Sequence, residues 1–392
     1  MGFAEFVGNA KGVAVLTRML ARERVPATLL LSGQKGVGKF TLATMFARAL
    51  LCEREKRDFC SGCESCRVLA ALDDLPNLLA QARAARGRAD PEEVPLVLQP
   101  HPDVSVLVPD PTYIRMSQMR AARRLAYSAP RRRRRVIIID DAERLRVDFA
   151  STLLKVLEEP PAHTHFVLIA HAPLELPATI RSRTVPLHFA PLTQQAIEAY
   201  LAQQRPKLAK KDRALVASAA AGSLGTALRF DLEHYRAVRR AALCYLRASI
   251  RPDGPYGRGV GPATREESYP TELFAATAEL AGRARRESAE GAGGERAEFE
   301  FSLDLLYSLL SDVLYLKAEA SDLGLHNPDV RSELERFSHQ IDWPWVAGKV
   351  SGLDRIKRRL RRNLNRQLAL DALAQGGLAS KLGESGEPAG AS

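Results

Sequence analysis

The sequence predicts an α/β fold built on a parallel β-sheet, followed by an all-helical carboxyl-terminal region. Three short apolar runs, at 27–31, 136–139 and 166–170, are separated by segments in which apolar residues recur at helical spacing. This pattern is typical of strands that helices cover on both faces. Residues 191–250 and 299–373 show helical spacing alone, which indicates that the sheet ends before them.

The chain of 392 residues is too long for one compact core, so we expect several domains. The predicted parts are a nucleotide-binding domain over 1–190, a helical lid over 191–232 and a helical oligomerisation domain over 233–375. Glycine and proline predict a flexible insertion at 251–298, with one short helix at 271–286, and a disordered tail at 376–392. Residues 73–100 form a second predicted insertion.

The charge of the chain favours a polyanionic partner such as nucleic acid. Lys and Arg number 57 against 46 Asp and Glu, a formal net charge of +11. Between residues 111 and 139 there are nine arginines and no carboxylate, and five of them form the run Arg131–Arg135. This run has two interpretations of equal weight: it contacts DNA phosphates, or it is an ordinary charge run that faces solvent. With no signal peptide or membrane-length apolar run, we expect a cytoplasmic protein with reduced cysteines.

A glycine-rich loop follows the first predicted strand and opens a predicted helix. Its glycines let the backbone curl so that N–H groups surround phosphate oxygens, and the helix amino terminus adds a partial positive charge. The lysine that ends the loop would reach the terminal phosphates of a nucleotide. A chance glycine-rich turn is the alternative, but the strand–loop–helix context favours a P-loop with the binding residues Gly33, Gly36, Gly38 and Lys39.

The Mg²⁺ ligands of this P-loop are incomplete. A working P-loop places Ser or Thr directly after the lysine, but here that residue is Phe40, and Thr41 is rotated by about 100° around the helix. Asp140 ends the apolar run at 136–139 and is placed to hold Mg²⁺ through water. Helix capping is the alternative role for Asp140 and Asp141. We therefore expect ATP and Mg²⁺ binding to be weak or absent.

Four cysteines lie in one short segment with the spacing Cys-x7-Cys-x2-Cys-x2-Cys. Two overlapping Cys-x2-Cys pairs let thiolates fold around one ion, and a fourth cysteine closes tetrahedral coordination. A disulfide framework lacks a secretory context, and iron–sulfur ligation is a further alternative. We predict a structural Zn²⁺ site held by Cys52, Cys60, Cys63 and Cys66. The fifth cysteine, Cys244, falls in an apolar helical stretch and is expected in the core.

Together these motifs resemble the bacterial clamp-loader ATPases of the AAA+ class, and within that family the delta-prime group. A cysteine module directly after the P-loop helix is typical of this family. Residues 153–161 (LLKVLEEPP) are similar to the family's LLKxLEEPP segment, a helix stopped by two prolines. Residues 180–184 (IRSRT) are similar to its Ser-Arg-Cys segment, with Thr184 replacing the cysteine. The resemblance covers most of residues 1–230.

The resemblance implies that Arg183 is an arginine finger. Its guanidinium would reach into the ATP site of an adjacent subunit and stabilise charge on the transferred phosphoryl group. The alternative is a plain surface arginine.

Beyond residue 230 the resemblance implies a helical collar. We interpret one predicted helical face there as a subunit interface: Ile356, Leu360, Leu364 and Leu368. Several positions depart from the hydrolysing members of the family, namely Phe40, Asp141 in place of Glu, Ala170 or His171 in place of a sensor Thr or Asn, and Gly225 in place of a sensor Arg.

These departures predict a stator subunit with little ATPase activity of its own. It would help a clamp loader of DNA polymerase III to place a sliding clamp on primed DNA during replication. The partners that the resemblance implies are the gamma/tau and delta subunits, the clamp and primer–template DNA. Two alternatives remain: a gamma/tau-type ATP-hydrolysing motor, and a zinc-containing nucleic-acid-binding module with a vestigial P-loop.

Overall fold

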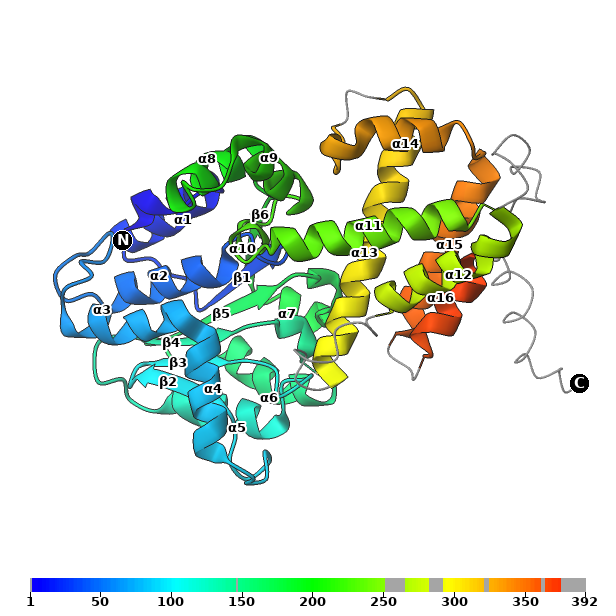
Figure 1. The fold of residues 1–392 in the computed structure, drawn as a ribbon. Helices are drawn as coiled ribbons and strands as arrows, with labels where there is room; N and C mark the ends of the chain where they lie inside the picture. Colours follow the sequence, from blue (N-terminus) through cyan, green and yellow to red (C-terminus); the bar gives the residue numbers. More distant parts are fainter. Residues whose placement is uncertain are drawn as a thin grey trace, which may run out of the picture. The chain divides into compact units, whose positions relative to one another are not determined.

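The computed structural model describes residues 2–145, 147–250, 265–281, 292–320, 324–360 and 364–374. Contacts within the chain define two compact units (Figure 1). The first unit comprises residues 1–206 and 220–228, and the second comprises 207–219 and 229–392. Residues 191–232 are therefore shared between the two units, and the separate lid over this range stays a prediction.

A six-stranded sheet forms the centre of the first unit, with the strand order β2-β3-β4-β5-β1-β6. All neighbouring strands are parallel except β2 and β3. The strands are β1 (Thr28–Gly33), β2 (Val97–His101), β3 (Val104–Leu107), β4 (Arg135–Ile139), β5 (Thr164–Ala170) and β6 (Val185–Phe189). The predicted α/β class and the three predicted strands are confirmed, because β1, β4 and β5 coincide with the three apolar runs.

Helices cover both faces of this sheet (Figure 1). One face packs on α5 to α7 in a core that includes Leu30, Ile137 and Phe166, while α2 packs on β1 and β5. Every residue of β4 and β5 is consequently buried. The α-helices of this unit are α1 (Ala10–Ala21), α2 (Lys39–Leu51), α3 (Glu64–Leu69), α4 (Leu75–Arg86), α5 (Met116–Tyr127), α6 (Val147–Glu158), α7 (Ala178–Arg181), α8 (Gln194–Gln204) and α10 (Leu224–Leu228).

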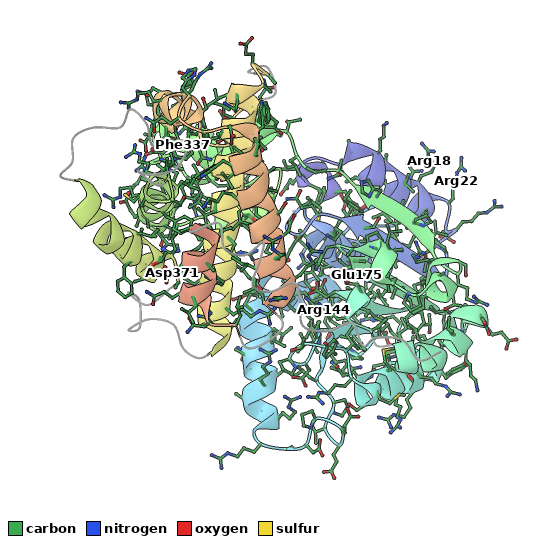
Figure 2. The ribbon with its side chains drawn as sticks, turned by 90° about the vertical axis from the view of Figure 1, so that its right-hand side faces the viewer. Arg18, Arg22, Arg144, Glu175, Phe337 and Asp371 are labelled. Carbon is green, nitrogen blue, oxygen red and sulfur yellow. The ribbon has the colours of Figure 1, made fainter. Side chains whose placement is uncertain are left out.

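Short 3-10 helices begin the chain and follow several of these elements. They are η1 (Phe3–Glu5), η2 (Ala70–Asp74), η3 (Ala142–Arg144) and η4 (Pro173–Glu175). Arg144 and Glu175, labelled in Figure 2, end the short helices that follow β4 and β5. Because β4 and β5 are parallel, η3 and η4 both begin at the carboxyl edge of the sheet, where ligands bind in open α/β folds.

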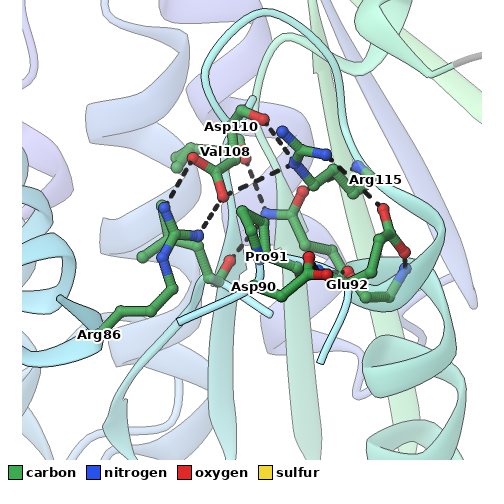
Figure 3. A network of polar contacts seen from close by, with 10 residues as sticks. Arg86, Asp90, Pro91, Glu92, Val108, Asp110 and Arg115 are labelled. Carbon is green, nitrogen blue, oxygen red and sulfur yellow. Dashed lines mark hydrogen bonds and ion pairs between the residues drawn. The ribbon is translucent and has the colours of Figure 1, made fainter. Parts of the chain in front are cut away.

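The segment expected as an insertion at 73–100 contains α4 and the edge strand β2. Charged side chains fasten it to the sheet (Figure 3). Arg86 on α4 donates hydrogen bonds to the buried carboxylate of Asp110, and Arg115 Nε donates to the Asp110 carbonyl at 2.8 Å. Arg115 also pairs with Glu92 at 3.7 Å. This segment is therefore an ordered part of the first unit.

The second unit is helical throughout its described residues. It contains α9 (Lys210–Ala219), α11 (Leu232–Ala248), α12 (Arg265–Leu280), α13 (Ala292–Lys317), η7 (Pro328–Val330), α14 (Arg331–Ser338), α15 (Trp343–Arg359) and α16 (Arg366–Ala374). The expected insertion at 251–298 lies outside the described residues over 251–264 and 282–291, as does the expected tail at 376–392. Between them, α12 takes the place of the short helix predicted at 271–286. Among the described helices, none is both long and apolar enough to cross a lipid bilayer.

Two expectations for the second unit are wrong. The apolar stripe from Ile356 to Leu368 does not lie on one helix, because α15 ends at Arg359 and α16 begins at Arg366. Ile356 is buried in the core of the unit, whereas Leu368 is 63% exposed. Cys244 was expected in the core but is exposed on α11. Helical spacing identified the helices here without fixing where one ends and the next begins.

Candidate functional site

The glycine-rich loop joins β1 to α2, as the sequence predicts. Gly36 and Gly38 adopt φ angles of +78° and +96°, which favour glycine, and Gly38 is the N-cap residue of α2. Lys39 is buried, and its ammonium donates hydrogen bonds to the carbonyls of Gly33 and Gln34, the latter at 2.8 Å. Burial lowers the pKa of Lys39, while Asp140, Glu143 and Asp141 act in the opposite direction. The loop has the backbone form of a phosphate-binding loop, and its lysine is folded onto it.

The first turn of α2 offers no hydroxyl at the position that follows the lysine. Phe40 is half-buried there, and Thr41 is exposed. Asp140 follows β4 directly, and burial, together with the neighbouring Asp141, raises its pKa to about 6. The weakened Mg²⁺ site stays a prediction.

The segment predicted to hold the second sensor lies against the phosphate loop. Gly225 N–H donates to the Gly36 carbonyl at 2.8 Å, and a Cβ added at Gly36 would collide with Ser223 Oγ. Gly225 itself places no side chain toward a nucleotide. The collision with Ser223 explains why a glycine is required at position 36. Because Gly225 stands where the sensor arginine is expected, this segment brings no guanidinium to the loop.

His171, one of the two residues predicted at the first sensor position, makes contacts that the sequence did not reveal. Its Nε2 lies 2.6 Å from Asp141 Oδ1 and 3.5 Å from Glu143 Oε1. Asp141 has a left-handed backbone (φ +48°) that turns the chain from β4 into η3, and its pairing with His171 lowers its pKa despite burial. Asp141 is thus engaged with an imidazole rather than placed alone as a base.

The four predicted cysteine ligands converge. Their sulfur atoms all lie within 4.8 Å of one another, and all four thiols are free. Backbone N–H groups of Glu55 and Cys60 donate to Cys52 Sγ, and that of Cys63 donates to Cys60 Sγ, at 3.3 to 3.4 Å. Such hydrogen bonds favour thiolates. A hydrogen bond from the Gly62 backbone is the main cause that lowers the pKa of Cys60 to about 7. Burial raises the pKa of Cys66. These four residues could hold a metal ion.

Aromatic and charged contacts dock the cysteine segment on the rest of the unit. Phe59 packs edge-on against Phe3, with ring centroids 6.0 Å apart, and lies under the Arg48 guanidinium. Arg132 pairs with Glu53 at 3.0 Å and with Glu64 at 3.5 Å. Sequence reasoning missed this docking because the partners lie far apart along the chain.

The arginine run has both internal and exposed members. Arg135 is buried and pairs with Asp103 at 3.6 Å, and Arg132 contacts the cysteine segment. The backbone N–H groups of Arg131 and Arg132 also donate to the Asp103 carboxylate, at 2.8 and 2.7 Å. Arg131 and Arg133 have exposed side chains. Part of the run is therefore structural, and part of it faces solvent.

Arg183 lies in the turn between α7 and β6. None of the contacts described for its side chain involves the phosphate loop of the same chain. Its guanidinium pairs with Glu158 at 2.7 Å and donates to the Thr179 carbonyl at 2.9 Å and to Ser182 Oγ at 3.2 Å. Its side chain is 36% exposed. Glu158 is the last residue of α6, within the LLKVLEEPP segment, so two predicted motifs meet here.

Two family models match the chain. The model for "DNA polymerase III, delta subunit" matches residues 8–90 and 91–193, and the model for "DNA polymerase III, delta subunit, C terminal" matches residues 296–374. Together they take in more than half of the chain and reach into both compact units.

Curated relatives include DNA polymerase III subunits of two kinds. The tau subunit of Salmonella typhimurium is 30% identical over 231 residues, covering 58% of this chain and 32% of that protein. The delta' subunits of Bacillus subtilis and Pseudomonas aeruginosa are 28% and 32% identical, covering 48% and 44% of this chain. The alignments cover 50% and 45% of those two proteins, so the chain spans about a third to a half of these relatives' lengths.

Solved structures similar to this chain include a gamma subunit-related protein of DNA polymerase III from Thermotoga maritima. It is 17% identical with a TM-score of 0.40, and the alignment covers 92% of this chain and 96% of that one. A RuvB mutant from the same organism has a TM-score of 0.38 at 17% identity, covering 59% and 63%. The family models and the delta' and tau relatives agree with the motifs described above, and the chain belongs to the bacterial clamp-loader family of DNA polymerase III subunits.

Proposed function

We propose that this chain is a delta-prime-like stator of a bacterial clamp loader that supplies Arg183 to the ATP site of a neighbouring subunit. The observation that supports this most is the contrast between two sites of the same unit. The phosphate loop carries Phe40 instead of a Mg²⁺-binding hydroxyl, while Arg183 lies half-exposed on a surface turn. A permanently charged, forked guanidinium suits the stabilisation of a phosphoryl group in transfer.

Glu158 would serve this role by holding the guanidinium until a subunit interface forms. The pair is partly exposed, and such ion pairs are weak enough in water to exchange partners. A nucleotide phosphate in an adjoining subunit would compete for the same N–H groups. Arg183 would then exchange one anion for another instead of losing a buried partner.

The cysteine site would hold a structural Zn²⁺ ion. Cys52, Cys60, Cys63 and Cys66 supply four thiolates, the set that closes zinc coordination and leaves no position for a reacting water. The N–H donors around Cys52 and Cys60 fit this role because they stabilise negative sulfur. The ion would supply folding free energy and no catalysis.

Any nucleotide bound by this chain would contact the backbone of Gly33, Gly36 and Gly38, with Lys39 and Asp140 near the terminal phosphates and Mg²⁺. Lys39 would first have to leave the carbonyls of Gly33 and Gln34. Because a hydroxyl is missing at Phe40, we expect weak binding and little or no turnover by the isolated chain.

The proposed partners are the gamma/tau and delta subunits, the sliding clamp and primer–template DNA, all in the cytoplasm. The helical second unit is the proposed collar. Exposed arginines on α5 and after it would meet the DNA phosphates: Arg120, Arg123, Arg124, Arg131 and Arg133.

Reconstitution with the gamma/tau and delta subunits tests the proposal. We expect Arg183→Ala to assemble normally by size-exclusion chromatography and to lower ATP turnover at one site by about a thousandfold or more. Arg18→Ala removes an exposed arginine from α1 (Figure 2) and should leave turnover unchanged. Full ATPase activity with Arg183→Ala, or failure of the wild-type chain to join the complex, would contradict the proposal.

A further inference from the structure

The proposed function does not use a cluster of three side chains at the carboxyl ends of β4 and β5. Asp141 and Glu143 follow β4, and His171 follows the neighbouring parallel strand β5. One possible ligand atom from each residue lies within 4.8 Å of the other two. The cluster thus brings two carboxylates and one imidazole to a common point.

Glu143 gives an independent reason to expect a cation here. Its side chain is 4% exposed, and Oε1 accepts the backbone N–H of His171 at 3.1 Å. Within the described part of the chain, no donor reaches the buried Oε2 atom. A buried carboxylate oxygen without a donor is costly unless a positive charge or a further ligand compensates for lost hydration.

We propose that Asp141, Glu143 and His171 form a binding site for a divalent first-row transition metal such as Mn²⁺, Fe²⁺ or Zn²⁺. An imidazole with two carboxylates suits these ions, whereas Mg²⁺ and Ca²⁺ prefer oxygen ligands alone. Metal bonds of about 2.1 Å place neighbouring donors about 3 Å apart, so the 2.6 Å pair of Asp141 and His171 would widen by a few tenths of an ångström.

This site differs from the usual Mg²⁺ site of a P-loop protein. That site needs a hydroxyl after the loop lysine and an aspartate at the strand end, which here are Phe40 and Asp140. The proposed site uses neither residue, and it does not depend on the clamp-loader role. The competing arrangement is a protonated His171 that links both carboxylates without any ion.

Binding of Mn²⁺ to the full-length chain, prepared with one zinc ion per chain for the four thiolates and without nucleotide, tests the proposal. Mn²⁺ is paramagnetic, and it prefers oxygen and nitrogen to the thiolates of the cysteine site. Electron paramagnetic resonance should show one bound Mn²⁺ per chain, with spin-echo modulation from an imidazole nitrogen. His171→Ala should remove this modulation and weaken binding at least about tenfold. His188→Ala, which changes an exposed histidine, and Asp140→Asn should leave the modulation unchanged.

Other results would overturn the site. Absence of bound Mn²⁺ at about 1 mM would assign the cluster to the protonated-histidine arrangement. Binding that survives His171→Ala but is lost in Asp140→Asn would place the ion at the usual P-loop position. Glu143→Gln retains the histidine and should weaken binding while keeping the nitrogen modulation. Melting temperature and zinc content verify that each variant is folded.

Discussion

Phe40 and Asp140 together determine how this chain can treat a nucleotide. Phe40 places a half-buried ring in the first turn of α2, where a hydroxyl would bind Mg²⁺. Asp140, the remaining candidate ligand, follows β4 directly, and burial raises its pKa to about 6. Gly36 and Gly38 keep the positive φ angles of the loop, so the proposed loss of Mg²⁺ binding would be confined to single side chains. Restoring one of them should restore part of the site.

Phe40→Thr should raise the affinity for an ATP analogue about tenfold in the presence of Mg²⁺, because one coordinated hydroxyl returns. Titration of a fluorescent nucleotide, with Mg²⁺ and with EDTA, measures the effect. Phe40→Leu removes the ring without adding a ligand and should not produce a Mg²⁺ dependence. Equal Mg²⁺-dependent binding by wild type and Phe40→Thr would instead favour the ATP-hydrolysing motor.

His326 should make the second unit more stable in mild acid. Its Nδ1 lies 3.1 Å from Asp312, whose side chain is fully buried, and this hydrogen bond raises the pKa of His326. The stabilisation is complete below the ordinary pKa of histidine and is lost as pH rises through the raised value. Because His326 is 36% exposed, we expect an effect below about 1 kcal/mol.

Urea denaturation between about pH 6 and pH 8 measures this dependence. The difference in unfolding free energy between wild type and His326→Ala should shrink as the pH rises. His339→Ala, which changes an exposed histidine of the same unit, is the matched control for removal of an imidazole. A difference that grows with pH would show that the sign is wrong.

Among the elements, the cysteine segment is small and depends on its contacts. Phe59 and Arg132 dock it on the amino-terminal residues and on the arginine run. The six-residue helix α3 begins within it, directly after Cys63. So short a helix gains most of its stability from packing rather than from its own turns. An ion that holds the four thiolates would thus stabilise the whole docked segment.

Cys63→Ser should lower the melting temperature of the first unit by roughly 5–10 °C, because loss of one ligand removes several kcal/mol of metal-binding free energy. Calorimetry with zinc analysis measures both quantities. Cys244→Ser, which changes an exposed thiol outside the cluster, should retain the zinc and the melting temperature. Equal melting of Cys63→Ser and wild type would contradict a structural ion.

Arg86 should be a stabilising residue of the α4 and β2 segment (Figure 3). Its side chain is 14% exposed, and its partner Asp110 is 5% exposed. Arg86→Ala would therefore leave a buried carboxylate with only the longer contact to Arg115, at 3.9 Å. We expect a loss of about 3 kcal/mol in unfolding free energy, measured by urea denaturation. Arg88→Ala, at an exposed position two residues later, should cost little. Similar stabilities of the two variants would contradict this role.

The elements that could be predicted from sequence are those with strong local patterns. β4 is a run of β-branched residues buried on both faces, and the cysteines converge because their spacing is local. β6 was missed because it is a largely exposed strand that contains Pro186. The contacts of His171 with Asp141 and of Arg183 with Glu158 join residues 25 or more positions apart. The pairing of β4 with β5 brings the first two together, and the packing of α6 against α7 brings the second two together.

For the whole molecule, the chain carries its recognisable motifs in the first unit and a helical second unit that the carboxyl-terminal family model matches. In the described part of the chain, the phosphate loop lacks a hydroxyl ligand for Mg²⁺, and Arg183 makes no contact with that loop. Such an arrangement makes sense for a subunit whose chemistry is completed in an assembly.

The decisive measurement is the ATP turnover of the reconstituted clamp loader, compared between Lys39→Ala and Arg183→Ala. A stator role for this chain predicts that Lys39→Ala keeps the wild-type rate, because the chain's own loop would not hydrolyse ATP, and that Arg183→Ala loses the turnover of one site. A fall in turnover with Lys39→Ala, together with a wild-type rate for Arg183→Ala, would contradict it.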